Sequence, residues 1–361
     1  MKIKLYEPWF DEKEEQAVLA TLRSKWWASG PKVVELEERI KAYTGAENAI
    51  AFNSATSAFH AVFSYFKGSG IRPIVLPSLT FISVAHSVLH AGHAITWRDV
   101  EPNGVHTLPG ASKGNLVVSM DYAGVPCAYA KTDGMLVIDA AHSLGGHTTY
   151  EGLKTRVGAF GDATVFSFHA VKNISSGCGG MVTTSDVMLA NYLRAARNFG
   201  YAKNAMDRQQ DKEPWVRHCL FPGYNFYMND IMATLAIEQL KKIDTILERR
   251  RALYETYADR LSGRVRFLEH PEGSGLHMFV VFVDAAIRNK TMAYLKTQGV
   301  ETAVHYTPIH WQEPYCKRYP ADLPHTDQAA RTLISLPFHT GLTQEEVGYV
   351  CTALLDGLTA S

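Results

Sequence analysis

Short apolar runs alternate with helical patterns through the first half of the chain, and this alternation restricts the fold more than any other feature. Buried strands are predicted at "NAIAF", "PIVLP", "AITWRDV", "NLVVSMDY", "MLVIDAA", "ATVFSFH" and "GGMVTT". Helical segments such as "SATSAFHAVFSYF" and "FISVAHSVLHAG" lie between several of them. This pattern is typical of a mostly parallel sheet covered by helices on both faces. We therefore expect an α/β fold with its ligand at the carboxyl ends of the strands.

A second domain is indicated by a change of pattern in the last third of the chain. A long helical pattern starts at Asn229, and it is followed by "VRFLE", "HMFVVFVDA", "TAVHY" and a final helix, "QEEVGYVCTALLDGL". The chain has 361 residues, which is long enough for two domains. We predict a large domain with an N-terminal arm over residues 1–245 and a smaller α+β domain over 246–361.

The charge balance and the cysteines bear on partners and compartment. Lys plus Arg and Asp plus Glu number 36 each, so no basic field attracts nucleic acid or an anionic membrane. The first residues lack the apolar run of a signal peptide, and no apolar run is long enough for a membrane helix. Five scattered cysteines without a C-x-x-C pair fit reduced thiols. We expect a cytoplasmic protein.

The histidines of "AHSVLHAGH" are spaced in a way that could suggest a metal site. His86, His90 and His93 could share one helix face. However, His93 lies two turns from His86, and the stretch also fits an ordinary helix that covers a sheet. We favour the second interpretation and expect no metal.

The segment "FSFHAVKNISSGCGG", residues 166–180, places Lys172 between an apolar strand and a glycine-rich turn. Most lysines at strand ends extend into water, and this segment alone does not exclude that role. The alternative is covalent chemistry, because a lysine amine beside a core can form a Schiff base.

Three hydroxyl side chains are placed where they could hold a phosphate group. The segment "FNSATSAFHAV" follows a strand and opens a helix, so its free backbone N–H groups and the Thr56 and Ser57 hydroxyls could bind an anion. Ser and Thr also cap many helices for structural reasons. Ser167, five residues before Lys172, could add another hydroxyl.

An acidic and an aromatic residue complete a possible cofactor site. "VIDAAHSLGG" ends a strand with Asp139, and His142 follows at the same strand end. A buried carboxylate needs a cationic or donor partner, although Asp139 could instead cap the next turn. Phe81 in "PSLTFIS" is placed to lie flat against a planar ring. Together with Lys172 and the hydroxyls, these residues indicate pyridoxal 5'-phosphate (PLP).

Motifs along nearly the whole chain resemble those of the DegT/DnrJ/EryC1/StrS sugar aminotransferases. The matching segments are "SGPKVVELE", "NSATSA", "PSLTFISVAHSVLHAG", "DAAHSLGG", "FSFHAVKN", "GYNFYMNDIMATLAIEQL", "VHYTPIH" and "SLPFHTGLTQEEV". "NSATSA", "MDYAG", "SFHAVK" and "VHYTPI" are most similar to UDP-4-keto-6-deoxy-sugar aminotransferases of pseudaminic acid biosynthesis. The resemblance implies a PLP-dependent transferase of fold type I. In that fold a large domain with a mostly parallel sheet between helices is joined to a smaller C-terminal α+β domain.

The resemblance also implies roles for individual residues. Lys172 forms the Schiff base, Asp139 contacts the pyridine nitrogen, and His142 lies near the ring hydroxyl. Other residues are implied in holding the cofactor or the substrate: Thr56, Ser57 and Ser167 at the phosphate, Phe81 on the ring, Asn225 at the phosphate of the neighbouring subunit's cofactor, and Ser29, His305, Tyr306 and His310 near the sugar.

The implied reaction is a ping-pong transamination in which PLP and its amine form (PMP) alternate. L-glutamate gives its amino group to a nucleotide-linked keto-deoxy sugar, such as a UDP-4-keto-6-deoxy-HexNAc, in a homodimer with shared active sites. The alternatives are a sugar dehydratase on the same scaffold, an amino-acid-directed enzyme of this fold, or a non-catalytic regulatory relative. The dehydratases usually have His in place of the lysine, and a non-catalytic relative is expected to lose Lys172 or Asp139, so both residues favour a transaminase.

Three features depart from the family pattern. Tyr227 stands where members often have Arg, and Cys178 stands where they commonly have Glu. The segment "VPCAYAKTDGMLVID" is shorter than the family norm. None of these departures removes a group that the chemistry needs.

Overall fold

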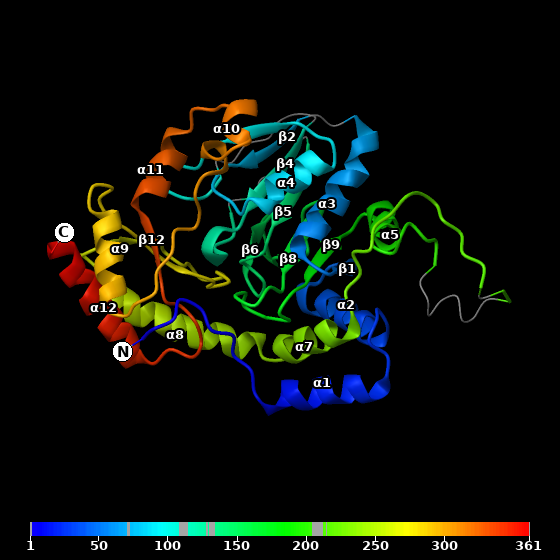
Figure 1. Ribbon diagram of the computed structural model, residues 1–361, viewed down its shortest axis with the longest axis horizontal. Coiled ribbons are helices and arrows are strands. Elements are labelled where there is room, and N and C mark those ends of the chain that lie inside the picture. The colour runs from blue at the N-terminus through cyan, green and yellow to red at the C-terminus, as the bar shows by residue number, and fades with distance from the viewer. Residues whose placement is uncertain are drawn as a thin grey trace.

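The computed structural model describes residues 2–70, 73–107, 115–127, 129, 134–203, 212–213 and 215–360. Its centre is a seven-stranded sheet in the order β1-β9-β8-β5-β4-β2-β3 (Figure 1). In chain order the strands are β1 (Asn48–Phe52), β2 (Ile74–Pro77), β3 (Ile95–Arg98), β4 (Leu116–Met120), β5 (Met135–Asp139), β8 (Ala163–Ser167) and β9 (Gly180–Thr184). Five neighbouring strands of the sheet, β3, β2, β4, β5 and β8, pair in parallel. β9 pairs antiparallel with both β8 and β1. The predictions of these seven strands and of a mostly parallel sheet are confirmed.

Helices cover both faces of this sheet because successive residues of each strand point to opposite sides. On β1, Ile50 and Phe52 join one apolar core, and Ala49 and Ala51 join another. The first core contains residues of α3 (Ala55–Phe66), α4 (Ser83–His90) and α5 (Val187–Ala196), and the second contains residues of α2 (Pro31–Thr44) and α7 (Asp230–Leu240). α1 (Glu12–Ser24) packs on the outer side of α7 (Figure 1). Two cores flanking one sheet leave the strand ends free to carry a site.

The C-terminal part has its own antiparallel sheet in the order β10-β11-β12. The strands are β10 (Arg266–Phe267), β11 (Phe279–Phe282) and β12 (Leu333–Leu336), and the helices packed with them are α8 (Ile243–Leu261), α9 (Arg288–Thr297) and α12 (Gln344–Thr359). The long helical pattern from Asn229 is two helices, since α7 ends at Leu240 and α8 starts at Ile243. The division at residues 245 and 246 falls inside α8 and stays a prediction.

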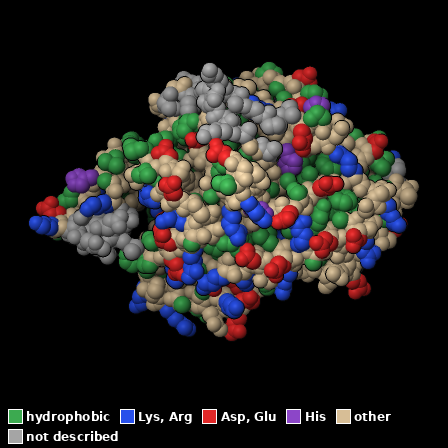
Figure 2. All heavy atoms as spheres, turned by 180° about the vertical axis from the view of Figure 1, so that it is seen from behind, with side chains coloured by type: hydrophobic (Ala, Val, Ile, Leu, Met, Phe, Trp, Pro, Cys, Tyr) green, Lys and Arg blue, Asp and Glu red, His purple; other side chains and the backbone are tan. Residues whose placement is uncertain are grey.

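The remaining elements are short and connect or flank the two sheets. They are a hairpin of β6 (His147–Tyr150) and β7 (Leu153–Arg156), helices α10 (Tyr315–Arg318) and α11 (Pro324–Thr332), and single turns η1 (Lys67–Ser69), η2 (Tyr122–Gly124) and η3 (Ile309–Trp311). Within the described residues, no helix is both long and apolar enough to cross a membrane. Basic and acidic side chains are intermixed over the face seen in Figure 2, as expected from their equal numbers.

Candidate active site

A cavity of about 260 Å³ lies at the carboxyl ends of the parallel strands. Asp139 ends β5 and Ser167 ends β8, so the parallel arrangement brings both to the same edge of the sheet. Eight of the predicted site residues line this cavity: Thr56, Phe81, Asp139, His142, Ser167, Lys172, His305 and Tyr306. The structure thus brings together residues from widely separated segments.

Lys172 projects into this cavity from a turn that follows β8. Its backbone N–H donates to the carbonyl of His169 at 2.9 Å, which fixes the turn. Desolvation lowers the pKa of Lys172 to about 8, and the carboxylate of Asp139 opposes this change. A lysine with this pKa is present in part as a neutral amine near pH 7, as a nucleophile must be.

Asp139 is a buried carboxylate that faces the same cavity, with 2% of its surface exposed. Its Oδ1 accepts a hydrogen bond from the Ala141 N–H at 3.2 Å, and its Oδ2 accepts one from the Thr80 hydroxyl at 3.3 Å. Burial raises the pKa of Asp139, and the Ala141 amide, Lys172 and Thr80 partly offset this effect. A buried carboxylate at the wall of a cavity fits a cationic ring nitrogen, so the residues present fit PLP.

His142 lies beside Asp139 and is held by residues from the C-terminal part. Its Nε2 lies 3.1 Å from the hydroxyl of Tyr306, and its ring centre lies 4.3 Å from that of His277. Burial lowers the pKa of His142 well below its usual value, so its imidazole is neutral. Neither His277 nor Thr80 was predicted from the sequence.

His305 and Tyr306 form the wall opposite the strand ends. The Nδ1 of His305 lies 2.8 Å from the Ser335 hydroxyl, and its Nε2 lies 3.4 Å from the Tyr6 hydroxyl. Burial lowers the pKa of His305 to about 4. The rings of Phe81 and Tyr306 meet edge to face at 5.9 Å, and Phe81 is 54% exposed at the mouth. A planar ligand can therefore enter beneath Phe81.

The N-terminus of α3 forms one end of the cavity. Ser54 caps the helix by accepting the Ser57 N–H at 3.1 Å. Thr56 lines the cavity, whereas the Ser57 hydroxyl donates to Asn53 Oδ1 at 2.7 Å and does not line it. Gly180 permits this geometry, because a Cβ there would lie 2.5 Å from the backbone nitrogen of Ala55.

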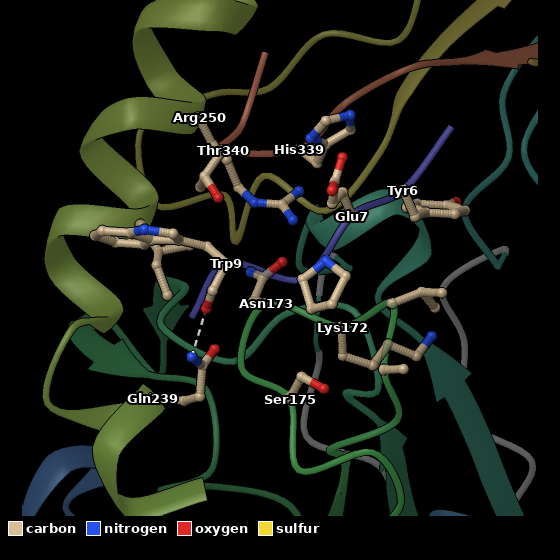
Figure 3. Close-up of a pocket in the computed structure, with 14 residues that line it drawn as sticks. Tyr6, Glu7, Trp9, Lys172, Asn173, Ser175, Gln239, Arg250, His339 and Thr340 are labelled. Carbon is tan, nitrogen blue, oxygen red and sulfur yellow. Dashed lines mark hydrogen bonds between the residues drawn. The ribbon is translucent and has the colours of Figure 1, made fainter. Parts of the chain in front are cut away.

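A second, water-sized cavity of about 10 Å³ lies next to the Lys172 segment (Figure 3). It is enclosed by residues 6–9 of the N-terminal segment, by Asn173 and by Arg250. The buried Arg250 donates to the carbonyls of Leu276 and His277 at 3.1 and 3.0 Å. Arg250 therefore fixes the segment that presents His277 to His142.

Besides Ser57, three further predicted site residues lie outside the main cavity. The buried imidazole of His310 lies between Ser78 Oγ at 2.7 Å and Asp327 Oδ1 at 3.1 Å. Asn225 is exposed. Ser29 lines another cavity of about 400 Å³, together with Tyr227, one of the departures from the family pattern.

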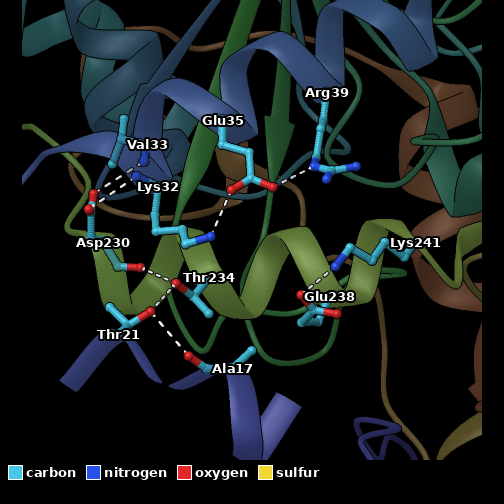
Figure 4. Close-up of polar contacts among 10 residues, drawn as sticks. All are labelled: Ala17, Thr21, Lys32, Val33, Glu35, Arg39, Asp230, Thr234, Glu238 and Lys241. Atoms are coloured by element: carbon cyan, nitrogen blue, oxygen red, sulfur yellow. Dashed lines mark hydrogen bonds and ion pairs between the residues drawn. The ribbon is translucent and has the colours of Figure 1, made fainter. Parts of the chain in front are cut away.

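The loop that carries Ser29 is fixed by Asp230 at the start of α7. Asp230 accepts the N–H groups of Gly30, Lys32 and Val33 at 2.8, 3.1 and 3.1 Å. Figure 4 shows the bonds to Lys32 and Val33. These are free donors at the N-terminus of α2, and a carboxylate there is favourable. The segments "SGPKV" and "GYNFYMND" are thus held together.

The cavity has further lining residues that the sequence analysis did not assign. His169 and Met120 are among them, and so is Cys178, whose Sγ lies 2.9 Å from the Asn53 carbonyl. His169 lies three residues before Lys172, inside a motif that was noted, but a motif alone does not show which side chains face a cavity. The shortened segment before β5 includes residues 128 and 130–133, which lie outside the described residues.

The histidines considered as metal ligands are separated. His93 Nε2 lies 2.9 Å from the Phe63 carbonyl. The rings of His86 and His90 stack along α4 with their centres 6.3 Å apart. Among the described residues, no group of three His, Cys, Asp or Glu side chains could hold a metal ion.

One cavity at the strand ends of this α/β fold is lined by a lysine with a lowered pKa and by a buried carboxylate. This arrangement is that of a PLP-dependent enzyme. The model of the DegT/DnrJ/EryC1/StrS aminotransferase family matches residues 8–355. The chain belongs to this family and is a PLP-dependent sugar aminotransferase.

Individual relatives agree with this assignment. The chain is 32% identical over 377 aligned residues to the spore coat polysaccharide biosynthesis protein SpsC of Bacillus subtilis, covering 97% of this chain and 95% of that protein. It matches the structure of PseC from Helicobacter pylori, an aminotransferase of pseudaminic acid biosynthesis, with a TM-score of 0.91, 26% identity and full coverage of both chains.

The sugar aminotransferase Spr1654 from Streptococcus pneumoniae, described as putative, is also similar. Its PMP form matches with a TM-score of 0.89 and 26% identity, covering 99% of this chain and all of that one. Its PLP form matches with a TM-score of 0.87 and 25% identity, covering 100% and 99%. These two forms agree with PLP and PMP as the cofactor states. The predictions of the family, the fold type and the cofactor are confirmed.

Proposed function

We propose that this enzyme transfers the amino group of L-glutamate to a nucleotide-linked 4-keto-6-deoxy sugar, specifically a UDP-4-keto-6-deoxy-HexNAc. The observation that carries the chemistry is the pair of Lys172 and Asp139 across one cavity, with the pKa of Lys172 lowered to about 8. The role of PseC in pseudaminic acid biosynthesis supports the sugar class. The polysaccharide role of SpsC supports a sugar product that enters a polymer.

Different residues of the cavity hold different parts of the cofactor. Thr56 and Ser167, with the backbone N–H groups at the start of α3, hold the phosphate. Asp139 pairs with the ring nitrogen, and Phe81 covers the ring at the mouth. Ser57 supports this end through its bond to Asn53.

When bound, PLP supplies an electron sink that stabilises negative charge on the carbon next to the nitrogen of the substrate. Asp139 favours the protonated ring nitrogen because it is a carboxylate in a buried place. Lys172 would hold the cofactor covalently at rest; during transfer its neutral amine would accept the proton and its ammonium form would return it. The Tyr306 hydroxyl holds His142 near the ring hydroxyl, and His305 borders the sugar together with Tyr306.

We also propose that the active enzyme is a homodimer in which Asn225 reaches the cofactor phosphate of the partner subunit. Asn225 is exposed, so it is free to contact a second chain. Several large apolar side chains are also exposed: Trp27, Phe199, Trp215 and Leu220, with exposures of 55%, 43%, 73% and 64%. Exposed apolar groups of this kind favour a protein interface. Ser29 and His310 stay predicted sugar contacts, with Ser29 acting across this interface.

The test is an assay with a panel of nucleotide-linked keto-sugars. L-glutamate is the donor, and release of 2-oxoglutarate is followed. We expect turnover with a UDP-4-keto-6-deoxy-HexNAc and much less with 3-keto sugars. Turnover only with free amino acids and 2-oxo acids would contradict the proposal.

A further inference from the structure

The main cavity carries few positive charges for the substrates it is proposed to bind. Glutamate has two carboxylates and a nucleotide sugar has a diphosphate, and such anions are bound by cationic or hydrogen-bonding groups. Among the described residues that line the cavity there is no arginine, and the lining lysine, Lys172, holds the cofactor. The remaining basic side chains are the imidazoles of His142, His169 and His305.

Two of these imidazoles are already engaged. His142 is buried, and its Nε2 lies 3.1 Å from the Tyr306 hydroxyl. His305 lies between the hydroxyls of Ser335 and Tyr6, at 2.8 and 3.4 Å. Burial lowers the pKa of both rings, so both stay neutral and serve as fixed parts of the wall.

His169 differs because it is exposed at the cavity while its backbone is fixed. Its N–H donates to the Ser167 hydroxyl at 3.4 Å, and its carbonyl accepts the Lys172 N–H at 2.9 Å. Its ring makes no hydrogen bond with any residue that the structure describes. A rigid backbone with an unengaged imidazole is suited to receive a ligand.

We propose that His169 is an anion-binding residue of the substrate site, where its imidazolium pairs with an oxyanion of the donor carboxylate or of the nucleotide diphosphate. This role rests on the proposed function. Both sources offer the same chemistry, and titration with a separate ligand for each source allows them to be told apart.

The charge of His169 depends on its surroundings. Desolvation lowers the pKa of His169, and the nearby Lys172 lowers it further, so the free ring is neutral at neutral pH. An anion that reaches the ring raises this pKa, and binding therefore becomes tighter as the pH falls. The other titratable side chains of the cavity wall are Asp139, His142, Cys178, His305 and Tyr306.

The experiment measures ligand binding calorimetrically at about pH 6 and about pH 8, on either side of an ordinary histidine pKa. The PLP form is titrated separately with UDP and with 2-oxoglutarate, neither of which can react with this form. The variants are His169→Asn, which removes the charge, and His169→Lys, which fixes it. His90→Asn is the matched control, because His90 is exposed on α4 and does not line the cavity.

We expect His169→Asn to weaken one of the two ligands roughly tenfold at about pH 6 and to abolish the pH dependence of its binding. His169→Lys should retain affinity without pH dependence, and His90→Asn should behave as wild type. If His169→Asn binds UDP more weakly, the anion that His169 binds is the diphosphate. If it binds 2-oxoglutarate more weakly, the anion is the donor carboxylate. Equal binding of both ligands by wild type and His169→Asn at both pH values would overturn the role of His169 alone. Failure of wild type to bind either ligand would overturn the proposed substrates as well.

Discussion

The Tyr306 hydroxyl lies 3.1 Å from Nε2 of His142 and joins the C-terminal part of the chain to the end of β5. Burial raises the pKa of Tyr306 well above its usual value and lowers that of His142, so a protonated hydroxyl lies beside a neutral imidazole. This hydrogen bond holds the imidazole of His142 in place whichever of the two groups donates.

Removal of the Tyr306 hydroxyl should slow catalysis without loss of the fold. We expect Tyr306→Phe to lower kcat about tenfold, since a lost hydrogen bond of this kind costs about 1–1.5 kcal/mol. Steady-state kinetics and the absorption spectrum of the bound cofactor measure the effect. Tyr315→Phe is the control, because the buried Tyr315 hydroxyl has no partner among the described residues. A fall of equal size in both variants would show that Tyr306 acts only through packing.

Asp139→Asn should separate catalysis from stability. An amide keeps the shape but cannot stabilise a protonated ring nitrogen, so we expect a loss of about 10³-fold in rate with cofactor still bound. The folded-state pKa of Asp139 is raised, so its ionisation penalises the apoenzyme once the pH exceeds the unfolded value. The apo variant should therefore unfold at a higher temperature than apo wild type at pH 7. Near-normal turnover by Asp139→Asn would show that Asp139 is not the partner of the ring nitrogen.

Reloading of the apoenzyme with cofactor should depend on pH through Lys172. Its amine must be neutral to attack the aldehyde, and its pKa is lowered to about 8. We expect the rate of PLP incorporation, followed by absorbance, to rise with pH and to be half-maximal near pH 8. Asp139 raises the pKa of Lys172, so Asp139→Asn should move the midpoint to lower pH. A midpoint near 10.5 in wild type, the ordinary lysine value, would contradict this account.

The shared site can be tested by mixing two impaired proteins. Removal of the Asn225 donor should weaken cofactor retention by about 1–3 kcal/mol. In a heterodimer of Lys172→Ala and Asn225→Ala chains, one site has both an intact lysine and an intact phosphate donor. When cofactor is limiting, the activity of the mixture should therefore exceed the sum of the activities of the two variants measured alone. If the subunits exchange and no excess activity appears, Asn225 serves its own chain or only the fold.

The strands could be predicted because they are apolar on both faces. Site residues at strand ends, such as Asp139 and Ser167, could be predicted because parallel strands end at the same edge of a sheet. β1 and β8 are examples, since each is a short apolar run that forms a buried strand. The hairpin of β6 and β7 was not predicted, because its residues are largely polar and half-buried or exposed.

Contacts between distant segments account for what the sequence analysis missed. Tyr6 and His277 are far apart in the sequence, yet their rings stack with centres 6.0 Å apart beside the active site. No local pattern marks either residue as part of a site. His310 lies in a motif that suggested a sugar contact, and this stays a prediction. The contacts of its ring with Ser78 and Asp327 could not be predicted, because they join segments far apart in the sequence.

The covalent attachment point of the cofactor tests the central claim most directly. The holoenzyme is reduced with borohydride, digested and examined by mass spectrometry, with Lys172→Ala treated in parallel. We predict a phosphopyridoxyl group on Lys172 in the wild type, and no label and no transamination in the folded variant. A label on any other lysine, or transamination by Lys172→Ala, would contradict the account.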